Sequence, residues 1–262
     1  MNRKSVEVLI STINQKDLSF VECMNIQTNC VIGNQNGSDR IRYISYGTLK
    51  CKLVCSSKKG LARNRNTTIE HSKADICLLA DDDITYVDGY EDIIINAFER
   101  HRDADVILFN LYEEPIVRYV IKREHRIKGI EFFKYGSVRI AFRRNSIKNK
   151  ISFDEEFGAG GKIPIGEDTI FLCDCLRSGL KLVAVPEYIC KLNPSDSTWF
   201  NGYNDAYFIN KGKMYYRMFG CWSILFAIQD AYRHRYRYGA DRKWIRNVHL
   251  MNIGASEYKC CY

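Results

Sequence analysis

Residues 78–84 read LLADDDI, and this stretch decides the fold class because three adjacent carboxylates directly follow an apolar run. The run, residues 74–80 (ADICLLA), has the length and composition of a buried strand. Ligands of open α/β sheets bind beyond the carboxyl ends of the strands. The sequence therefore predicts that Asp81, Asp82 and Asp83 lie at the ligand-binding edge of such a sheet.

Apolar strand patterns alternate with helical patterns over the first 110 residues. Strands are predicted at 6–13, 29–36, 41–46, 74–80, 104–112 and 137–142, and helices at 17–26, 60–72 and 88–101. Asp88 and Glu91 have capping-box spacing at the start of the last helix. This alternation predicts a Rossmann-like α/β sheet, mostly parallel and flanked by helices. Residues 201–262 are predicted to form a helical, basic and aromatic appendage.

Composition narrows the class of protein. The 262 residues are 46% apolar and 27% charged, which is typical of a folded globular chain. Eleven cysteines, mostly inside apolar runs, favour core thiols in a reducing cytoplasm over a disulfide framework. Cys173 and Cys175 lack a second pair at zinc-site spacing, so core packing is favoured over a metal site. No apolar run reaches membrane-spanning length.

The three aspartates admit two interpretations. In an extended segment Asp81 and Asp83 point to one side and Asp82 to the other. Two carboxylates on one side suit Mg²⁺ or Mn²⁺, whose shell a substrate diphosphate completes. The alternative is a solvated acidic turn before the helix near Asp88.

Two further stretches favour a site. Residues 58–66 (KKGLARNRN) place Lys58, Lys59, Arg63 and Arg65 around a helix start, which suits a diphosphate. Residues 158–171 (GAGGKIPIGEDTIF) form a glycine-rich loop that leads to Glu167 and Asp168 at the start of a helix. The alternatives are a solvated basic helix face and acids that complement the helix dipole. If Glu167 and Asp168 belong to a site, this acidic pair supplies a general base beside a flexible cleft.

The order of LISTIN, GLARNRN, LLADDDI and GEDTIFL resembles that of the inverting glycosyltransferases of family 2 with the GT-A fold. The resemblance covers about residues 5–200. It implies a catalytic domain over 1–200, with a nucleotide-binding half at 1–110 and an acceptor half at 111–200. It also implies metal-assisted, inverting transfer of a hexose from a nucleotide sugar, by default a UDP-sugar. The acceptor is a saccharide or lipid-linked molecule of bacterial surface-polysaccharide synthesis.

The resemblance also implies a role for individual residues. Asp168 is the general base, and Glu167 positions the acceptor. Asp83 is the main ligand of Mn²⁺ or Mg²⁺, and Asp81 joins the metal shell or the ribose site. The nucleotide site takes in Ser11, Thr12, Arg63, Asp81 and Asp82, with Arg63 near the diphosphate.

One feature departs from the family. Many relatives carry a histidine after the last core strand, where this chain has Asn193 and Pro194. The metal is therefore expected on Asp83, diphosphate and water, without a third protein ligand. A non-catalytic saccharide- or nucleotide-binding protein on the same fold is the alternative function.

The C-terminal segment suggests a partner. Met214, Met218, Trp222, Leu225 and Tyr232 recur near one helical face, although Gly220 can interrupt the helix. Residues 232–246 carry six basic residues against Asp241 alone. An anionic membrane surface is the expected partner of residues 213–246, which would place the protein peripherally on the inner face of the membrane. The alternative is packing of the stripe onto the catalytic domain. No nucleic-acid motif accompanies residues 232–238 (YRHRYRY), so no nucleic-acid partner is expected.

Overall fold

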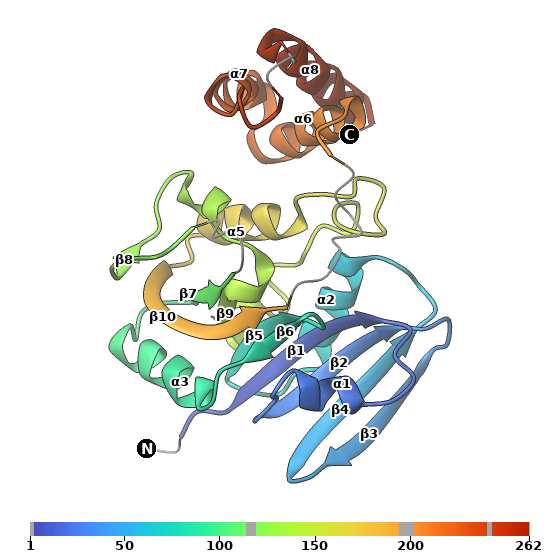
Figure 1. The fold of residues 1–262 in the computed structure, drawn as a ribbon, viewed down its shortest axis with the longest axis vertical. Helices are drawn as coiled ribbons and strands as arrows, with labels where there is room; N and C mark the ends of the chain where they lie inside the picture. The colour runs from blue at the N-terminus through green and yellow to red at the C-terminus, as the bar shows by residue number, and fades with distance from the viewer. Residues whose placement is uncertain (1–2, 114–118, 194–201, 240–242, 262) are drawn as a thin grey trace.

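A computed structural model of the protein describes residues 3–113, 119–193, 202–239 and 243–261. Within these residues a ten-stranded sheet has the order β3-β4-β2-β1-β5-β9-β7-β10-β6, with β8 pairing with β10 off this path. The strands are β1 Val6–Ile13, β2 Asn29–Gln35, β3 Arg40–Tyr46, β4 Leu49–Ser56, β5 Ile76–Asp81, β6 Ile84–Tyr86, β7 Val106–Tyr112, β8 His125–Arg126, β9 Ile140–Arg143 and β10 Leu182–Leu192. Figure 1 shows the twisted sheet with helices around it.

The longer ladders of the sheet are mostly parallel. β1 pairs in parallel with β2 and β5, β2 with β4, and β7 with β10. β9 is antiparallel to both β5 and β7 and joins the two parallel parts. The α/β, mostly parallel fold class predicted from the sequence is confirmed.

Helices cover both faces of the sheet because successive strand residues point to opposite sides. Leu9 belongs to one core with residues of α2 (Leu61–His71) and α5 (Glu167–Arg177). Val8 and Ile10 belong to the other, with α1 (Ser19–Cys23) and α3 (Tyr90–Arg100). The remaining short helices are α4 Arg144–Ile147, η1 Glu131–Lys134 and η2 Ser137–Arg139. Cys173 and Cys175 are buried on α5, as expected for core thiols.

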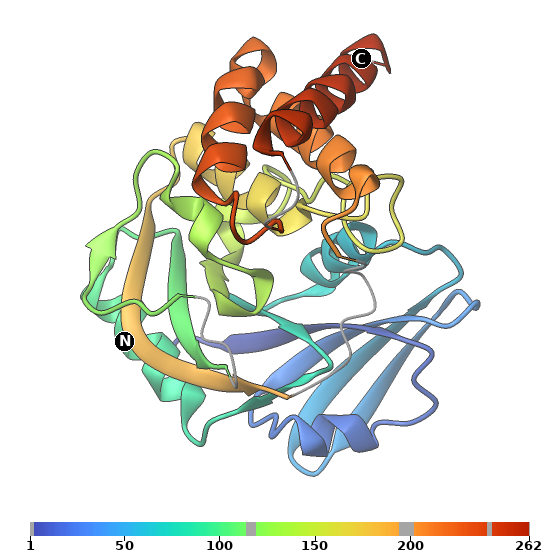
Figure 2. The same cartoon turned by 45° about the horizontal axis from the view of Figure 1, so that its top comes forward.

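Three helices form a layer beyond α5: α6 Asp205–Phe219, α7 Ser223–Arg233 and α8 Trp244–Cys261, with η3 Gly220–Trp222 between the first two. Figures 1 and 2 show this layer at one end of the molecule, far from β3. A β-carbon at Gly212 would lie 1.8 Å from the Met251 carbonyl oxygen, and one at Gly254 would lie 1.9 Å from that of Ile209. α6 and α8 therefore cross in backbone contact, which only glycine permits.

Three local predictions differ from the structure. Residues 17–26 form only the short helix α1, and β4 was not predicted although its lysines alternate with Cys51 and Leu53. Asp88 does not cap α3, which begins after Gly89. Its carboxylate instead accepts hydrogen bonds from the side chains of Asn25 and Gln27, so long-range partners replace the local capping box.

The predicted apolar stripe of the appendage is also divided. Gly220 has φ 54° and ends α6, so the helix does not continue. Met214 and Met218 are buried, whereas Trp222, Leu225 and Tyr232 are exposed. Pro194 and Asp241 lie outside the described residues. No helix in the described part of the chain is long and apolar enough to cross a bilayer.

Candidate functional site

The carboxyl ends of β1 and β5 bring the first predicted site residues together. Ser11 is the register partner of Asp81 on β5. Thr12 Oγ1 donates a hydrogen bond to Asp82, whose Oδ2 also accepts one from Gln15 Nε2 at 3.1 Å. Ser11 Oγ is buried without a hydrogen-bond partner. This edge is therefore polar where an open α/β sheet binds its ligand.

Asp82 and Asp83 form a tight turn between β5 and β6. The alternation expected of an extended segment is therefore wrong beyond Asp81, because Asp82 and Asp83 lie in a turn. The main chain of Asn193 donates a 2.8 Å hydrogen bond to the Asp83 carbonyl oxygen. This bond holds the turn against the end of β10.

Arg65, on α2, links the two acidic motifs. Its side chain is 2% exposed. Nη2 lies 2.9 Å from Asp81 Oδ1 and Nη1 lies 2.9 Å from Glu167 Oε1. Nη2 also donates to Ser137 Oγ at 2.8 Å, whereas Nε is buried without a partner. One buried guanidinium thus joins the donor edge of the sheet to the start of α5.

Glu167 and Asp168 lie in the first turn of α5, which begins after Gly166. Burial, with repulsion from Asp168, raises the pKa of Glu167 to about 7, although Arg65 opposes the shift. Asp168 Oδ1 accepts a 2.7 Å hydrogen bond from the Thr169 main chain. A β-carbon at Gly158, where φ is 92°, would lie 2.9 Å from the Glu167 carboxyl carbon. The glycine loop therefore packs directly on this acid.

Arg63 lies outside this network. Its guanidinium pairs with Glu155 at 2.6 Å, and both side chains are well exposed. Arg65 is the residue that contacts the acidic motifs, while the role of Arg63 near a diphosphate remains a prediction. Ser137 was missed because only the folding of η2 beside β5 brings it to Asp81.

The carboxyl end of β5 is the predicted site of a divalent cation. Among the described residues, no three His, Cys, Asp or Glu side chains converge as a complete metal site. Asp81 is engaged by Arg65, so a cation bound through Asp81 would share this carboxylate with the guanidinium. Hard cations that bind substrate phosphates commonly use one or two carboxylates. The donor set at the end of β5 therefore fits a cation shared with a diphosphate.

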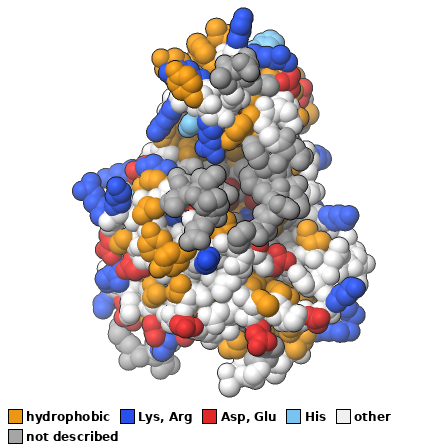
Figure 3. Space-filling model, in the orientation of Figure 1, with side chains coloured by type: hydrophobic (Ala, Val, Ile, Leu, Met, Phe, Trp, Pro, Cys, Tyr) orange, Lys and Arg blue, Asp and Glu red, His pale blue; other side chains and the backbone are white. Residues whose placement is uncertain are grey.

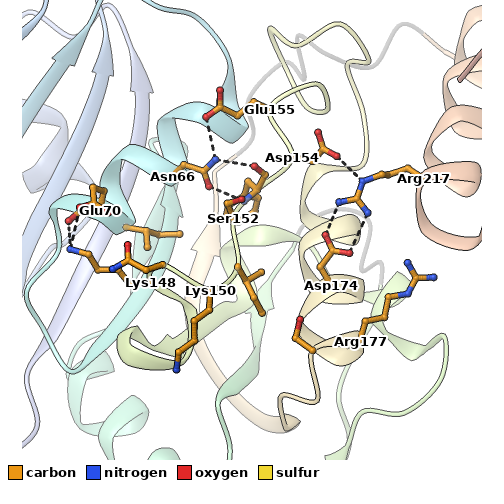
Figure 4. Close-up of a pocket in the computed structure, with 15 residues that line it drawn as sticks. Asn66, Glu70, Lys148, Lys150, Ser152, Asp154, Glu155, Asp174, Arg177 and Arg217 are labelled. Atoms are coloured by element: carbon orange, nitrogen blue, oxygen red, sulfur yellow. Dashed lines mark hydrogen bonds and ion pairs between the residues drawn. The ribbon is translucent and has the colours of Figure 1, made fainter. Parts of the chain in front are cut away.

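A groove of about 870 Å³, whose lining does not include Asp81, lies between α2, α5 and α6 (Figure 4). Some of its charged side chains pair with one another. Arg217 on α6 contacts Asp154 at 2.8 Å and Asp174 on α5 at 2.9 Å, and Lys148 pairs with Glu70 at 3.5 Å. The two pairs of Arg217 connect the C-terminal layer to α5 and to the segment that holds Asp154.

Residues 29–165 match the family model for glycosyl transferase family 2. The chain belongs to this family. The match covers half of the chain and includes β5 and Arg65, so glycosyl transfer is its class of activity. The resemblance seen in the sequence is confirmed. No curated protein matches the chain.

Solved structures agree with this family assignment. The crystal structure of S. aureus TarS 1-349 has a TM-score of 0.57 at 12% identity, over 95% of this chain and 70% of that one. The complex of TarS 1-349 with UDP-GlcNAc has a TM-score of 0.57 at 12% identity, over 97% and 71%. The S. aureus TarS structure gives 0.59 at 12% identity, over 88% of this chain and only 43% of that one. These similarities establish the GT-A fold.

Proposed function

We propose that this family 2 member transfers a hexose from a UDP-sugar to a saccharide or lipid-linked acceptor, with inversion at the anomeric carbon. The observation that carries the proposal is the Arg65 bridge between Asp81 and Glu167. It holds a donor-side carboxylate and the acidic pair of α5 in one buried network. The TarS complexes with UDP-GlcNAc and UDP support a uridine nucleotide as the donor class.

On the donor side, the polar edge of β1 and β5 receives the nucleotide. Ser11, Thr12 and Asp82 form its wall, and the buried hydroxyl of Ser11 is a group that a ligand can satisfy. Arg63 lies at the start of α2, where it can reach a diphosphate after exchanging its exposed partner Glu155. An exposed ion pair of this kind contributes only about 0–1 kcal/mol, so the exchange costs little.

On the acceptor side, Asp168 takes the proton of the attacking hydroxyl. The acceptor oxygen forms a bond to the anomeric carbon while the opposite bond to the nucleoside diphosphate breaks. One base on the acceptor face is sufficient for this single displacement with inversion. Glu167 positions the acceptor and is itself fixed by Arg65. The same guanidinium thereby sets the relative position of the two substrates.

We also assign a cofactor site to this chain. Asp83, assisted by Asp81, would hold Mn²⁺ or Mg²⁺ together with the donor diphosphate and water. When bound, such a cation stabilises the negative charge that grows on the leaving phosphate.

The proposal extends to the domains and the location. We assign residues 1–110 to the nucleotide, residues 111–200 to the acceptor and residues 201–262 to an appendage. We place the protein in the cytoplasm, peripherally on the inner face of the membrane, with residues 213–246 as the segment that approaches anionic lipid.

The test is the substitution Asp83→Ala. Titration calorimetry of UDP with Mn²⁺ should show loss of the metal-dependent part of binding, with an unchanged circular-dichroism spectrum. Asp88→Ala is the matched control, because Asp88 is an exposed acid five positions along that contacts Asn25 and Gln27 instead. Unchanged Mn²⁺-dependent affinity in Asp83→Ala would refute the metal assignment.

Release of UDP from a UDP-sugar tests the activity itself. If the wild-type chain binds UDP-sugars but neither transfers nor hydrolyses them with any saccharide acceptor or lipid extract, the non-catalytic binding protein becomes the better account.

A further inference from the structure

Helix α7 presents a row of apolar side chains to solvent. Trp222 is 65% exposed, Leu225 is 54% exposed, Ile228 is 42% exposed and Tyr232 is 55% exposed. Their spacing of three or four residues places them along one side of the helix. The opposite side, with Ala227 and Ala231, packs into the core. Among the described residues, this amphipathic arrangement leaves a row of apolar side chains exposed.

The first turn of α8 extends this surface. The Trp244 ring lies 5.7 Å from that of Tyr232, and Ile245 is 63% exposed. We call the set Trp222, Ile224, Leu225, Ile228, Tyr232 and Ile245 the α7 face. Figure 3 shows hydrophobic and basic side chains together at the end of the molecule that α6, α7 and α8 form. Clustered apolar surface of this kind marks an interaction site.

The exposed charged residues that the structure describes between 220 and 249 are all basic. Arg233, Arg237 and Lys243 are exposed, and Arg235 lies over the rings of Tyr232 and Tyr236 at 4.6 and 4.4 Å. Within the described residues from 220 to 249, the single acid is Asp230, which is buried and paired with Lys211. A partner of the α7 face therefore meets cations and apolar groups but no exposed carboxylate of this segment.

We propose that the α7 face docks on an anionic lipid bilayer, with α7 lying in the plane of the headgroups. This inference rests on the proposed function insofar as a lipid-linked acceptor gives the docking its purpose. Apolar side chains with Trp and Tyr suit the boundary between headgroups and acyl chains, and the arginines suit anionic lipid phosphates. Fewer residues contact the membrane than the sequence predicted, because Met214 and Met218 of the predicted apolar stripe belong to the core.

A second patch offers a control of similar chemistry. On strand β3, Ile41 is 49% exposed and Tyr43 is 76% exposed, next to the exposed cations Arg40 and Arg42. This patch lies at the opposite end of the molecule from α7 (Figure 1). Substitutions there remove exposed apolar side chains without changing the α7 face.

The experiment is co-sedimentation of the full chain, without donor, with vesicles of phosphatidylcholine alone or mixed with phosphatidylglycerol. We expect binding to the mixed vesicles only, weakened by salt. The triple variant Trp222→Ala, Leu225→Gln and Ile228→Gln should bind about 100-fold more weakly. The double variant Arg233→Gln and Arg235→Gln should lose about 25-fold, since each cation near an anionic surface is worth about five-fold. The β3 double variant Ile41→Gln and Tyr43→Gln should bind like the wild type.

Several outcomes would overturn the proposal. They are equal binding to neutral vesicles, unchanged binding in the triple variant, or an equal loss in the β3 control. Binding to random-sequence RNA without binding to vesicles would identify a polyanion as the partner instead. All variants are checked for UDP affinity by calorimetry, so a failed glycosyltransferase assignment appears as absent UDP binding while the vesicle result stands by itself.

Discussion

Two buried cations, one in each part of the molecule, make different use of the same chemistry. Arg65 lies between the sheet and α5 and is shared by Asp81 and Glu167. Lys211 lies among the C-terminal helices and contacts Asp230 at 2.8 Å and the Tyr238 hydroxyl at 2.6 Å. Both are removed from water, and both need carboxylates to remain charged there.

The pKa values of the carboxylates beside the two cations are shifted in opposite directions. Lys211 and the Tyr238 hydroxyl lower the pKa of Asp230 despite its burial, and His234 also contacts it. By contrast, burial and Asp168 raise the pKa of Glu167 to about 7. The Lys211 cluster therefore stabilises the charge of Asp230, although burial lowers the pKa of Lys211 itself. In the Arg65 cluster, burial disfavours the charged form of Glu167. Shifted pKa values of this kind are common at substrate-binding sites.

The largest expected difference between the clusters is in catalysis. Asp168→Asn should keep UDP binding and lose about 10²–10⁴-fold in turnover, because the amide cannot accept the acceptor proton. Asp230→Asn is the matched change in the other cluster and should retain turnover per folded molecule. Turnover is measured as UDP release with saturating donor. A near wild-type rate in Asp168→Asn would remove this residue from the role of base and make Glu167 the next candidate.

The next difference concerns how removing each cation changes stability and the pH profile of turnover. Arg65→Met and Lys211→Met each leave buried acids without their partner, so urea titration should show destabilisation by about 3–5 kcal/mol. Only Arg65→Met should also shift the pH profile of turnover, because Glu167 then titrates without a cation beside it. Identical pH profiles for the two variants and the wild type would mean that Arg65 has a purely structural role.

The smallest expected effect is the dependence of stability on pH. The folded pKa of Glu167 is raised from 4.5 to about 7, so its contribution is largest below about pH 4.5 and is lost as the pH rises to about 7. The folded pKa of Asp230 is lowered from 3.8, so its contribution is present above about pH 4 and is lost in acid.

Urea titrations between about pH 3 and pH 8 cover both pH ranges and check the direction in which each acid changes the free energy of unfolding. Glu167→Gln should flatten the decline between pH 4.5 and pH 7, by up to about 3 kcal/mol. Asp230→Asn should reduce the dependence in acid only. The same slope in both variants above pH 5 would contradict the contrast between the clusters.

Sequence patterns identified the motifs of the site better than the contacts between them. The strand before the aspartates and the acids at the start of α5 were predictable because burial and a helix start leave local signals. The choice of Arg63 over Arg65 shows the limit. On α2 the buried residues are Ala62, Asn64, Arg65, Thr68 and Ile69, so Arg65 lies on the inner face of the helix and Arg63 does not.

Contacts between distant segments explain the remaining misses. Asp88 has a capping partner three residues away in the sequence, yet its carboxylate contacts Asn25 and Gln27. Ser137 reaches Asp81 across 56 positions. The turn at Asp82 and Asp83 depends on a bond to Asn193. Local propensity does not contain such partners, because they form only when the whole sheet assembles.

The glycine crossing of α6 and α8 has a consequence for reach. Gly212 and Gly254 bring the two backbones into direct contact, and Arg217 ties α6 to Asp174 on α5. Ala227 and Ala231 of α7 pack into the same core as α5, so this packing sets the distance between the proposed base, Asp168, and a membrane beneath the α7 face. A chain docked in this way would hold its proposed base at one distance from the bilayer. It would select lipid-linked acceptors whose reactive hydroxyl extends from the bilayer by that distance, and longer or shorter saccharides would be poor substrates whatever their sugars.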